Sequence, residues 1–106
     1  MNHSELRVTL REFVNERDWS KFHTPTNLAK SIVIESAELL ECFQWSDEPA
    51  REDVSDELAD ILTYCYLLAD TLSLDLDRIV ADKLERTRAK YPVDKARGVS
   101  TKYDRL

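Results

Sequence analysis

The stretch that decides the fold is LAKSIVIESAELLECF, residues 28–43. Its apolar residues recur at steps of three and four, and it contains neither Gly nor Pro, which is typical of an amphipathic α-helix. A second stretch with the same periodicity, DVSDELADILTYCYLLADTL, covers residues 53–72, and Pro49 marks the turn between the two. Together they predict a pair of core-forming helices. The apolar arc of the first helix is wide, which predicts contacts on more than one of its sides.

Further helices are predicted on both sides of this pair. The N-terminal one is expected to begin at a cap on Ser4 and to end near Asp18. The C-terminal one is expected to begin at Ser73 or Asp75 and to stop before Pro92, because proline disfavours helical geometry in the residue that precedes it.

A loop and a tail complete the chain. Residues 19–27 are rich in small polar side chains, which predicts a loop that ends in a helix cap at Thr24 or Thr26. Residues 93–106 have no periodicity and are expected to form an irregular tail, either mobile or docked on a partner. The predicted organisation is an all-α, four-helix domain over residues 1–92 followed by this tail.

Composition agrees with a single all-α domain. The 106 residues include one Gly and three Pro, which are too few for the many turns of a strand-rich chain. The net charge of −6 argues against nucleic acid or an anionic membrane as the main partner. No apolar run reaches the ~20 residues of a membrane span, and the N-terminus has no signal-peptide core, so a cytoplasmic location is expected. Cys42 and Cys65 lie in apolar stretches and are expected to be buried, reduced thiols.

Acidic residues recur with the same spacing in both core-forming helices, as Glu35 and Glu38 in the first and Glu57 and Asp60 in the second. A step of three residues leaves two side chains roughly 60° apart on one helix face. If the helices pack through their apolar arcs, four carboxylates meet and repel one another unless a cation neutralises them. Mg²⁺, an oxygen-seeking ion, is the candidate, with Mn²⁺ as the alternative. The competing interpretation is a solvated acidic face, since the chain carries 21 Asp and Glu.

These motifs resemble the MazG-type all-α nucleoside triphosphate pyrophosphohydrolases. The motifs that carry the likeness are ESAELLE at 35–41 with FQW at 43–45, DELADI at 56–61, and the element from Lys83 to Tyr91-Pro92. Within that family, the dCTP pyrophosphatase subgroup is the most similar, on the strength of RDW at 17–19, FH at 22–23, Pro25 and NL at 27–28.

The resemblance implies hydrolysis of a nucleoside triphosphate, dCTP-like or modified, to the monophosphate and pyrophosphate, as in nucleotide-pool house-cleaning. The residues that match the family's metal ligands are Glu35, Glu38, Glu57 and Asp60. The resemblance also implies that the chain forms a homodimer or homotetramer. Two alternatives stay open. One is a dUTPase-like relative with the same metal site, and the other is a non-catalytic helical regulatory or interaction module whose acidic edges bind a basic partner.

Other residues are candidates for catalysis and for substrate binding. Either an acid of the metal set or Glu41 is expected to orient the attacking water, although Glu41 is turned about 120° from Glu35, which equally favours a solvent or salt-bridge role. Thr87 stands where the family usually has Asn and lacks the amide's paired donor and acceptor. The residues expected to contact substrate are His23, Asn27, Trp45, Lys83, Thr87 and Tyr91. Trp19 is as well suited to packing as to stacking on a base.

Overall fold

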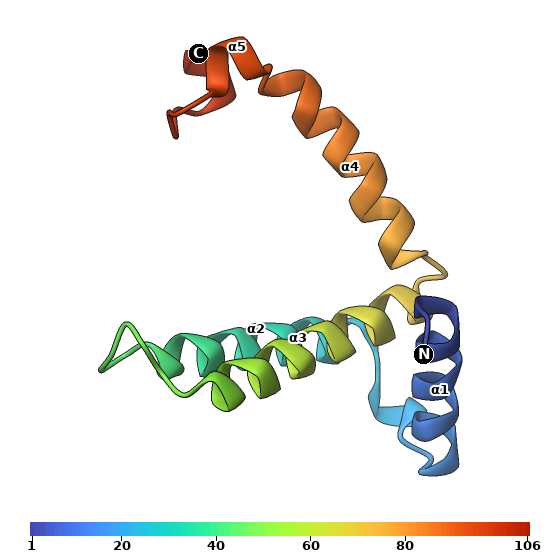
Figure 1. The fold of residues 1–106 in the computed structure, drawn as a ribbon. Coiled ribbons are helices and arrows are strands. Elements are labelled where there is room, and N and C mark those ends of the chain that lie inside the picture. The colour runs from blue at the N-terminus through green and yellow to red at the C-terminus, as the bar shows by residue number, and fades with distance from the viewer. The chain divides into compact units, whose positions relative to one another are not determined.

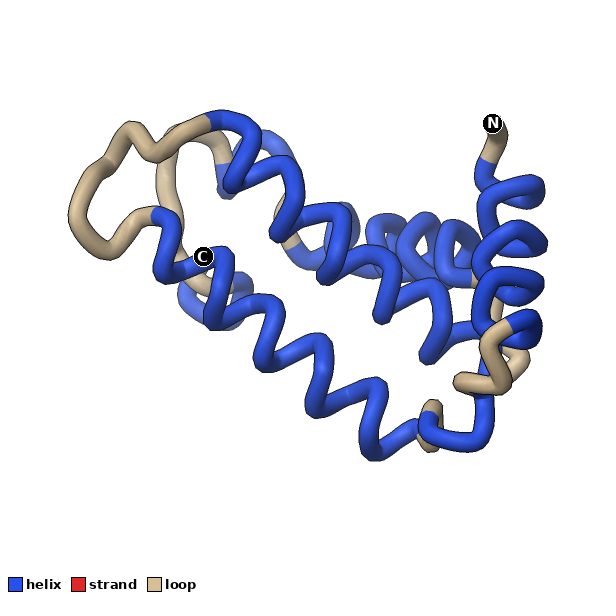
Figure 2. The backbone as a smooth tube through the Cα atoms, turned by 90° about the horizontal axis from the view of Figure 1, so that it is seen from below, coloured by secondary structure: helices blue, strands red, loops and turns tan.

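The computed structural model describes residues 1–106 and contains helices and no strands, which confirms the all-α prediction (Figure 2). Four long helices follow one another along the chain, α1 (His3–Glu16), α2 (Pro25–Cys42), α3 (Arg51–Thr71) and α4 (Leu76–Lys90). Three short helical elements complete the fold, η1 (Ser20–Phe22), α5 (Val93–Ala96) and η2 (Tyr103–Arg105). None of the helices is both long enough and apolar enough to cross a bilayer.

The chain divides into two compact units, Met1–Leu74 and Asp75–Leu106. In the first unit, α2 and α3 lie side by side and run in opposite directions, and α1 crosses them near the end of α3 (Figure 1). Each of the three helices places one apolar side chain in the shared core, namely Val14, Leu28 and Leu67. Leu28 is 1% exposed and is the one large side chain that is fully buried.

The start of α2 follows the predicted pattern. The Thr24 hydroxyl accepts a hydrogen bond from the backbone amide of Asn27 at 3.1 Å, and Pro25 occupies the first turn, where its missing N–H costs nothing. Asp75 caps α4 in the same way, because its carboxylate accepts from the amide of Arg78 at 3.2 Å. Of the two caps predicted for each helix, Thr24 is confirmed for α2 and Asp75 for α4.

The predicted cap of α1 is wrong, because Asn2 takes this role in place of Ser4. The Asn2 side chain accepts from the amide of Glu5 at 2.9 Å, and the Glu5 carboxylate accepts from the amide of Asn2 at 3.3 Å. This reciprocal pair satisfies two otherwise unpaired amides at once. At its other end α1 stops at Glu16, short of the predicted end near Asp18, which itself adopts a left-handed backbone with φ of 53°.

The cysteines were expected to be buried. Both Cys42 and Cys65 are free thiols, and both are half-buried rather than buried. Burial is the largest influence on each thiol and raises the pKa of each, so neither is activated as a thiolate.

The second unit consists of α4 and a tail that folds back onto the end of this helix. The backbone amide of Tyr103 donates a hydrogen bond to the Tyr91 hydroxyl at 3.2 Å, and the two rings meet edge to face with centroids 6.1 Å apart. The Lys90 ammonium lies 4.6 Å from the centre of the Tyr103 ring. The segment expected to be irregular thus contains α5 and η2, and it is held by contacts with Tyr91.

Candidate metal centre and adjoining cavity

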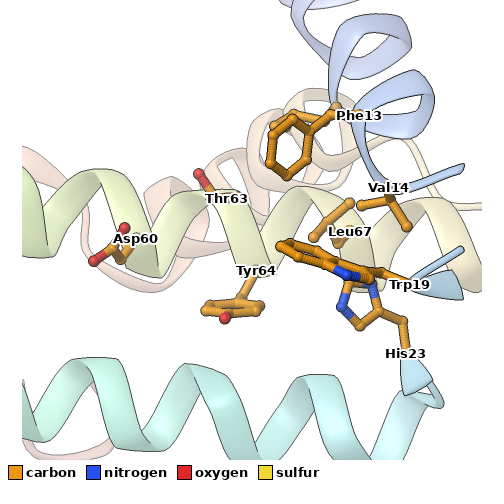
Figure 3. A pocket seen from close by; sticks show the side chains of 9 residues that line it. Phe13, Val14, Trp19, His23, Asp60, Thr63, Tyr64 and Leu67 are labelled. Atoms are coloured by element: carbon orange, nitrogen blue, oxygen red, sulfur yellow. The ribbon is translucent and has the colours of Figure 1, made fainter. Parts of the chain in front are cut away.

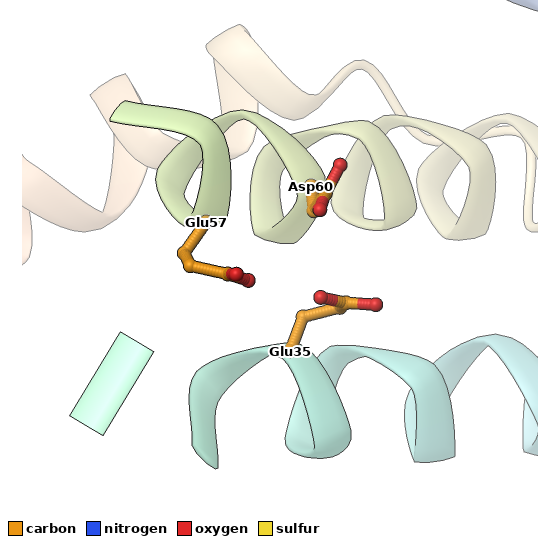
Figure 4. Close-up of side chains that lie close together, drawn as sticks. All are labelled: Glu35, Glu57 and Asp60. Carbon is orange, nitrogen blue, oxygen red and sulfur yellow. The ribbon is translucent and has the colours of Figure 1, made fainter. Parts of the chain in front are cut away.

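Acidic side chains from α2 and α3 converge between the two helices. Glu35 extends from α2 toward Glu57 and Asp60 of α3, as Figure 4 shows. One carboxylate oxygen from each of the three lies within 4.8 Å of the others. Glu38 lies outside this group of three, but it is near enough to raise the pKa of both Glu35 and Glu57. Of the four acids that the spacing predicts to meet, the structure brings the oxygens of three together.

The cluster is electrostatically strained without a cation. The pKa of Glu35 is raised to about 7, first by the hydrogen bond with Glu38, then by burial, and then by the negative charges of Glu38, Asp60 and Glu57. The pKa of Glu57 is also raised, chiefly by burial and then by the charge of Glu38. Crowding and burial both disfavour the charged forms of these two acids.

Two oxygen atoms in the cluster have no partner. Oε2 of Glu35 and Oε2 of Glu57 are buried and accept no hydrogen bond. Buried acceptors are nearly always satisfied, so such a pair needs an explanation, and a bound ion is one of the few available. Carboxylate oxygens are the ligands that hard divalent cations prefer. The donor set therefore fits a divalent metal ion.

Glu41 lies on a different side of α2. It lines a groove together with Ala37, Leu40 and Gln44, and it is not part of the acidic cluster. The 100° turn per residue of an α-helix accounts for this, because it carries position 41 away from the direction of Glu35.

A cavity of about 300 Å³ adjoins the cluster, between α1, the η1 loop and α3 (Figure 3). Its lining is mainly apolar and aromatic, and consists of Leu10, Phe13, Val14, Trp19, His23, Asp60, Thr63, Tyr64 and Leu67. The Phe13 and Trp19 rings meet edge to face with centroids 5.6 Å apart. Asp60 belongs to both the cavity and the acidic cluster, so a molecule in the cavity would reach the carboxylates.

Asn27, in the first turn of α2, holds the loop that carries His23. The Asn27 side-chain amide donates a hydrogen bond to the carbonyl of Phe22 at 3.0 Å, which ties η1 to the first turn of α2. His23 is half-buried and lines the cavity. Asn27 does not line the cavity. Its side-chain amide instead positions the loop that contributes His23.

Some residues of the cavity were predicted from the sequence and others were missed. The sequence predicts His23 as a substrate contact and offers Trp19 as a stacking residue, but it does not point to Phe13 or Tyr64 as part of a binding cavity. Tyr64 follows Asp60 by four residues, which places both on one face of α3, and this spacing was a usable signal. Trp45 is 89% exposed and does not line the cavity of its own chain.

The remaining substrate candidates belong to Asp75–Leu106, the second compact unit. The Thr87 hydroxyl donates to the carbonyl of Lys83 at 3.1 Å, and the Tyr91 hydroxyl accepts from Tyr103. A threonine that bonds its own helix in this way still has lone pairs to accept from a ligand. Contact of these residues with substrate stays a prediction.

The chain is similar to known proteins in both sequence and structure. The model of the MazG-like family matches residues 30–106. The chain is 39% identical to dCTP pyrophosphatase 1 of Rattus norvegicus and 38% identical to that of Homo sapiens, in each case over 96% of the chain and 66% of the relative. It thus spans about two thirds of the length of these curated relatives. The crystal structure of a pyrophosphatase from Archaeoglobus fulgidus DSM 4304 has 41% sequence identity and a TM-score of 0.80, covering 87% of this chain and 94% of that one. The chain belongs to the MazG-like family.

Proposed function

We propose that this protein is a nucleoside triphosphate pyrophosphohydrolase, which cleaves the bond between the α- and β-phosphates and releases a nucleoside monophosphate and pyrophosphate. The observation that carries the proposal is the acidic cluster of Glu35, Glu57 and Asp60 opening onto an aromatic cavity. The names of the similar proteins, dCTP pyrophosphatase 1 and an archaeal pyrophosphatase, support the same chemistry.

Mg²⁺ is the cation that we propose for the cluster, with Mn²⁺ as a substitute. The residues that would hold it are Glu35, Glu38, Glu57 and Asp60. When bound there, the ion would neutralise phosphate charge and lower the pKa of the attacking water. We assign the orientation of that water to an acid of the cluster in preference to Glu41, because Glu41 lies on another side of α2.

The cavity is the proposed site of the base. Its volume of about 300 Å³ lies at the lower end of the range for small-molecule pockets, which suits one base and its sugar. The rings of Phe13, Trp19 and Tyr64 offer surfaces for stacking, which contributes about 1–3 kcal/mol per base and tolerates any base. His23 is the polar group best placed to distinguish one base edge from another. A deoxynucleotide of the dCTP class is the proposed substrate.

The other predicted contacts belong to the same proposal. Lys83, Thr87 and Tyr91 would supply a cationic and polar edge for the phosphates, and Asn27 would support the base pocket through its loop. Because Trp45 does not line the cavity of its own chain, a role in base binding requires that a second copy supply it. A homodimer or homotetramer and a cytoplasmic location are further parts of the proposal.

A panel of nucleoside triphosphates tests the activity. The purified chain should release pyrophosphate, and not orthophosphate, from at least one dNTP when Mg²⁺ is present, and excess chelator should stop it. Asp60→Asn should abolish turnover, whereas Asp47→Asn, the same change at an exposed acid outside the cluster, should not. Orthophosphate as the primary product would refute the assignment. Activity confined to dUTP would favour the dUTPase-like alternative, and no turnover with any nucleotide would favour a non-catalytic module.

A further inference from the structure

The Tyr91 side chain, at the end of α4, is held by the tail that follows this helix. The backbone amide of Tyr103 donates a hydrogen bond to the Tyr91 hydroxyl, and the two rings meet edge to face. The Lys90 ammonium, from the last turn of α4, lies over the Tyr103 ring. Three contacts thus join Tyr103 to the end of α4, although Tyr91 and Tyr103 are twelve positions apart in the chain.

A tight reversal of the backbone brings Tyr103 back to this position. α5 ends at Ala96, whose carbonyl accepts a hydrogen bond from the amide of Val99 at 3.2 Å. Gly98, within this turn, has a φ of 77°, a left-handed backbone that glycine adopts without strain. The return of the tail to Tyr91 therefore has a cause within the tail itself.

The proton of the Tyr91 hydroxyl is left for a ligand. A phenol has one O–H to donate and lone pairs that accept. The Tyr103 amide uses a lone pair, and residues 75–106 offer the proton no acceptor. Thr87, one turn earlier, donates its own proton to the carbonyl of Lys83. Of these two hydroxyl groups at the end of α4, only that of Tyr91 therefore has a proton to donate to a ligand.

The charges around this hydroxyl group favour an anionic acceptor. Residues 83–106 contain eight Lys and Arg but three Asp and Glu, in a chain whose net charge is −6. One ion pair is found among them, between Arg88 and Glu85 at 3.5 Å. Lys83 precedes Tyr91 by eight residues, or two steps of four, which places both on one side of α4. A phosphate oxygen suits both groups, because hydrogen bonds to an ionised acceptor are the strong ones.

We propose that Tyr103 is a positioning residue, whose backbone amide fixes the Tyr91 hydroxyl so that Tyr91 donates its proton to a phosphate oxygen of the substrate. The inference rests on the proposed function, in which Tyr91 belongs to the polar edge that binds the phosphates. Fixing the side chain beforehand lowers the entropy lost when the ligand binds. A hydroxyl group that accepts a hydrogen bond is also a stronger donor, because successive hydrogen bonds polarise one another.

Removal of a single N–H tests the proposal. Incorporation of the α-hydroxy analogue of tyrosine at position 103 puts an ester oxygen in place of the amide N–H and keeps the ring. KM for each dNTP that is hydrolysed should rise about threefold to tenfold, as expected for one lost hydrogen bond, while kcat changes by less than about twofold. The Kd of inorganic triphosphate in the presence of Mg²⁺, measured by calorimetry, should rise by the same factor.

Two further variants show whether the effect passes through Tyr91. Tyr103→Phe keeps both the ring and the amide, so this matched control should behave like the wild type. Tyr91→Phe lacks the hydroxyl group and should raise KM and Kd at least as much as the ester does. The ester should then have no further effect in Tyr91→Phe, and this comparison also cancels the influence of the weaker ester carbonyl at Lys102.

Several outcomes would overturn the proposal. KM and Kd that are unchanged by the ester are one, and an equal rise in the Tyr91→Phe background is another, because the effect would then bypass Tyr91. A fall in kcat with KM and Kd unchanged would show a loss of folded protein and no role in binding. Failure of the proposed function looks different: the wild type would release no pyrophosphate, yet the Kd of triphosphate would still report on the contact between Tyr91 and Tyr103. A wild type that binds no triphosphate would overturn this inference as well.

Discussion

Protons and the divalent cation should compete for Glu35. The pKa of this carboxyl group is raised to about 7, above its ordinary value of 4.5. Since metal ligands must be ionised, cation binding has to displace a proton when the pH is below about 7. The perturbation is a change of pH from 8 to 6 at a fixed Mg²⁺ concentration.

The size of the effect follows from the pKa of Glu35. The group is about nine-tenths ionised at pH 8 and about one-tenth ionised at pH 6, so the apparent affinity should fall about tenfold. At a concentration of 100 times the dissociation constant, a cation stabilises the fold by about 2.7 kcal/mol, and at ten times by about 1.4 kcal/mol. One kcal/mol shifts the melting temperature of a domain of this size by about 4–8 °C. The rise produced by Mg²⁺ should therefore be roughly halved at pH 6.

The cation-free protein should show the opposite trend. Because the folded-state pKa of Glu35 is above its unfolded value, the stability from this group is fully present below about pH 4.5 and is lost as the pH rises through about 7. Glu35→Gln should remove this loss and raise the melting temperature of the cation-free protein at pH 8. It should also abolish the response to Mg²⁺.

Differential scanning fluorimetry from pH 5 to 8, with Mg²⁺ and with chelator, measures both effects. Glu12→Gln on α1 is the matched control, and it should behave like the wild type. A Mg²⁺ response that is equal at pH 6 and pH 8 would refute the competition, and a full response in Glu35→Gln would remove this residue from the site.

Three further predictions concern the core, an ion pair and the cavity. Leu28→Ala should lower the free energy of unfolding by about 2–5 kcal/mol in urea melts, because Leu28 is 1% exposed and leaves a void in the only core of Met1–Leu74. Arg11 donates to Asp70 across α1 and α3, and its hydrogen bond holds the pKa of Asp70 below the ordinary value. Stability from this pair is present above the unfolded pKa of Asp70 and is lost as the pH falls through the folded one. Arg11→Met should therefore flatten the acid limb of the stability curve below about pH 4, and the change should be small because both side chains are partly exposed. In steady-state kinetics, Trp19→Ala should raise KM for several dNTPs alike, and His23→Ala should narrow the gap between good and poor bases; unchanged KM and base ranking in both would place the base elsewhere.

The helices could be predicted because their cause is local. Steps of three and four in α2 and α3 determine both the helices and the face on which they pack, and Thr24 lies directly before Pro25, a strong start signal. The cap of α1 was missed although its signal was also local. Ser4 is followed three residues later by Arg7, which cannot complete a capping box, whereas Asn2 is followed by Glu5, which can.

The acidic cluster could be predicted for the same reason, but the cavity could not. Its walls come from α1, the η1 loop and α3, and nothing in the sequence states where α1 crosses α3. Trp45 was expected to border the base together with His23, yet these residues stand at opposite ends of α2. With 18 residues at 1.5 Å each, α2 is about 27 Å long, so one small cavity cannot include both residues of a single chain.

The two sides of α2 together explain how this chain can carry so small a core. Its inner side places Glu35 where a purely structural helix would place an apolar residue, and the resulting crowding raises the pKa of Glu35 and Glu57. That strain weakens the contact between α2 and α3 unless a cation relieves it. On the outer side, Val33 and Leu40 are exposed, so within Met1–Leu74 this side of α2 gains little hydrophobic stabilisation. A cation on the inner side would stabilise this helix, because it binds only the folded form, and it can therefore compensate for the side chains that the cluster keeps out of the core.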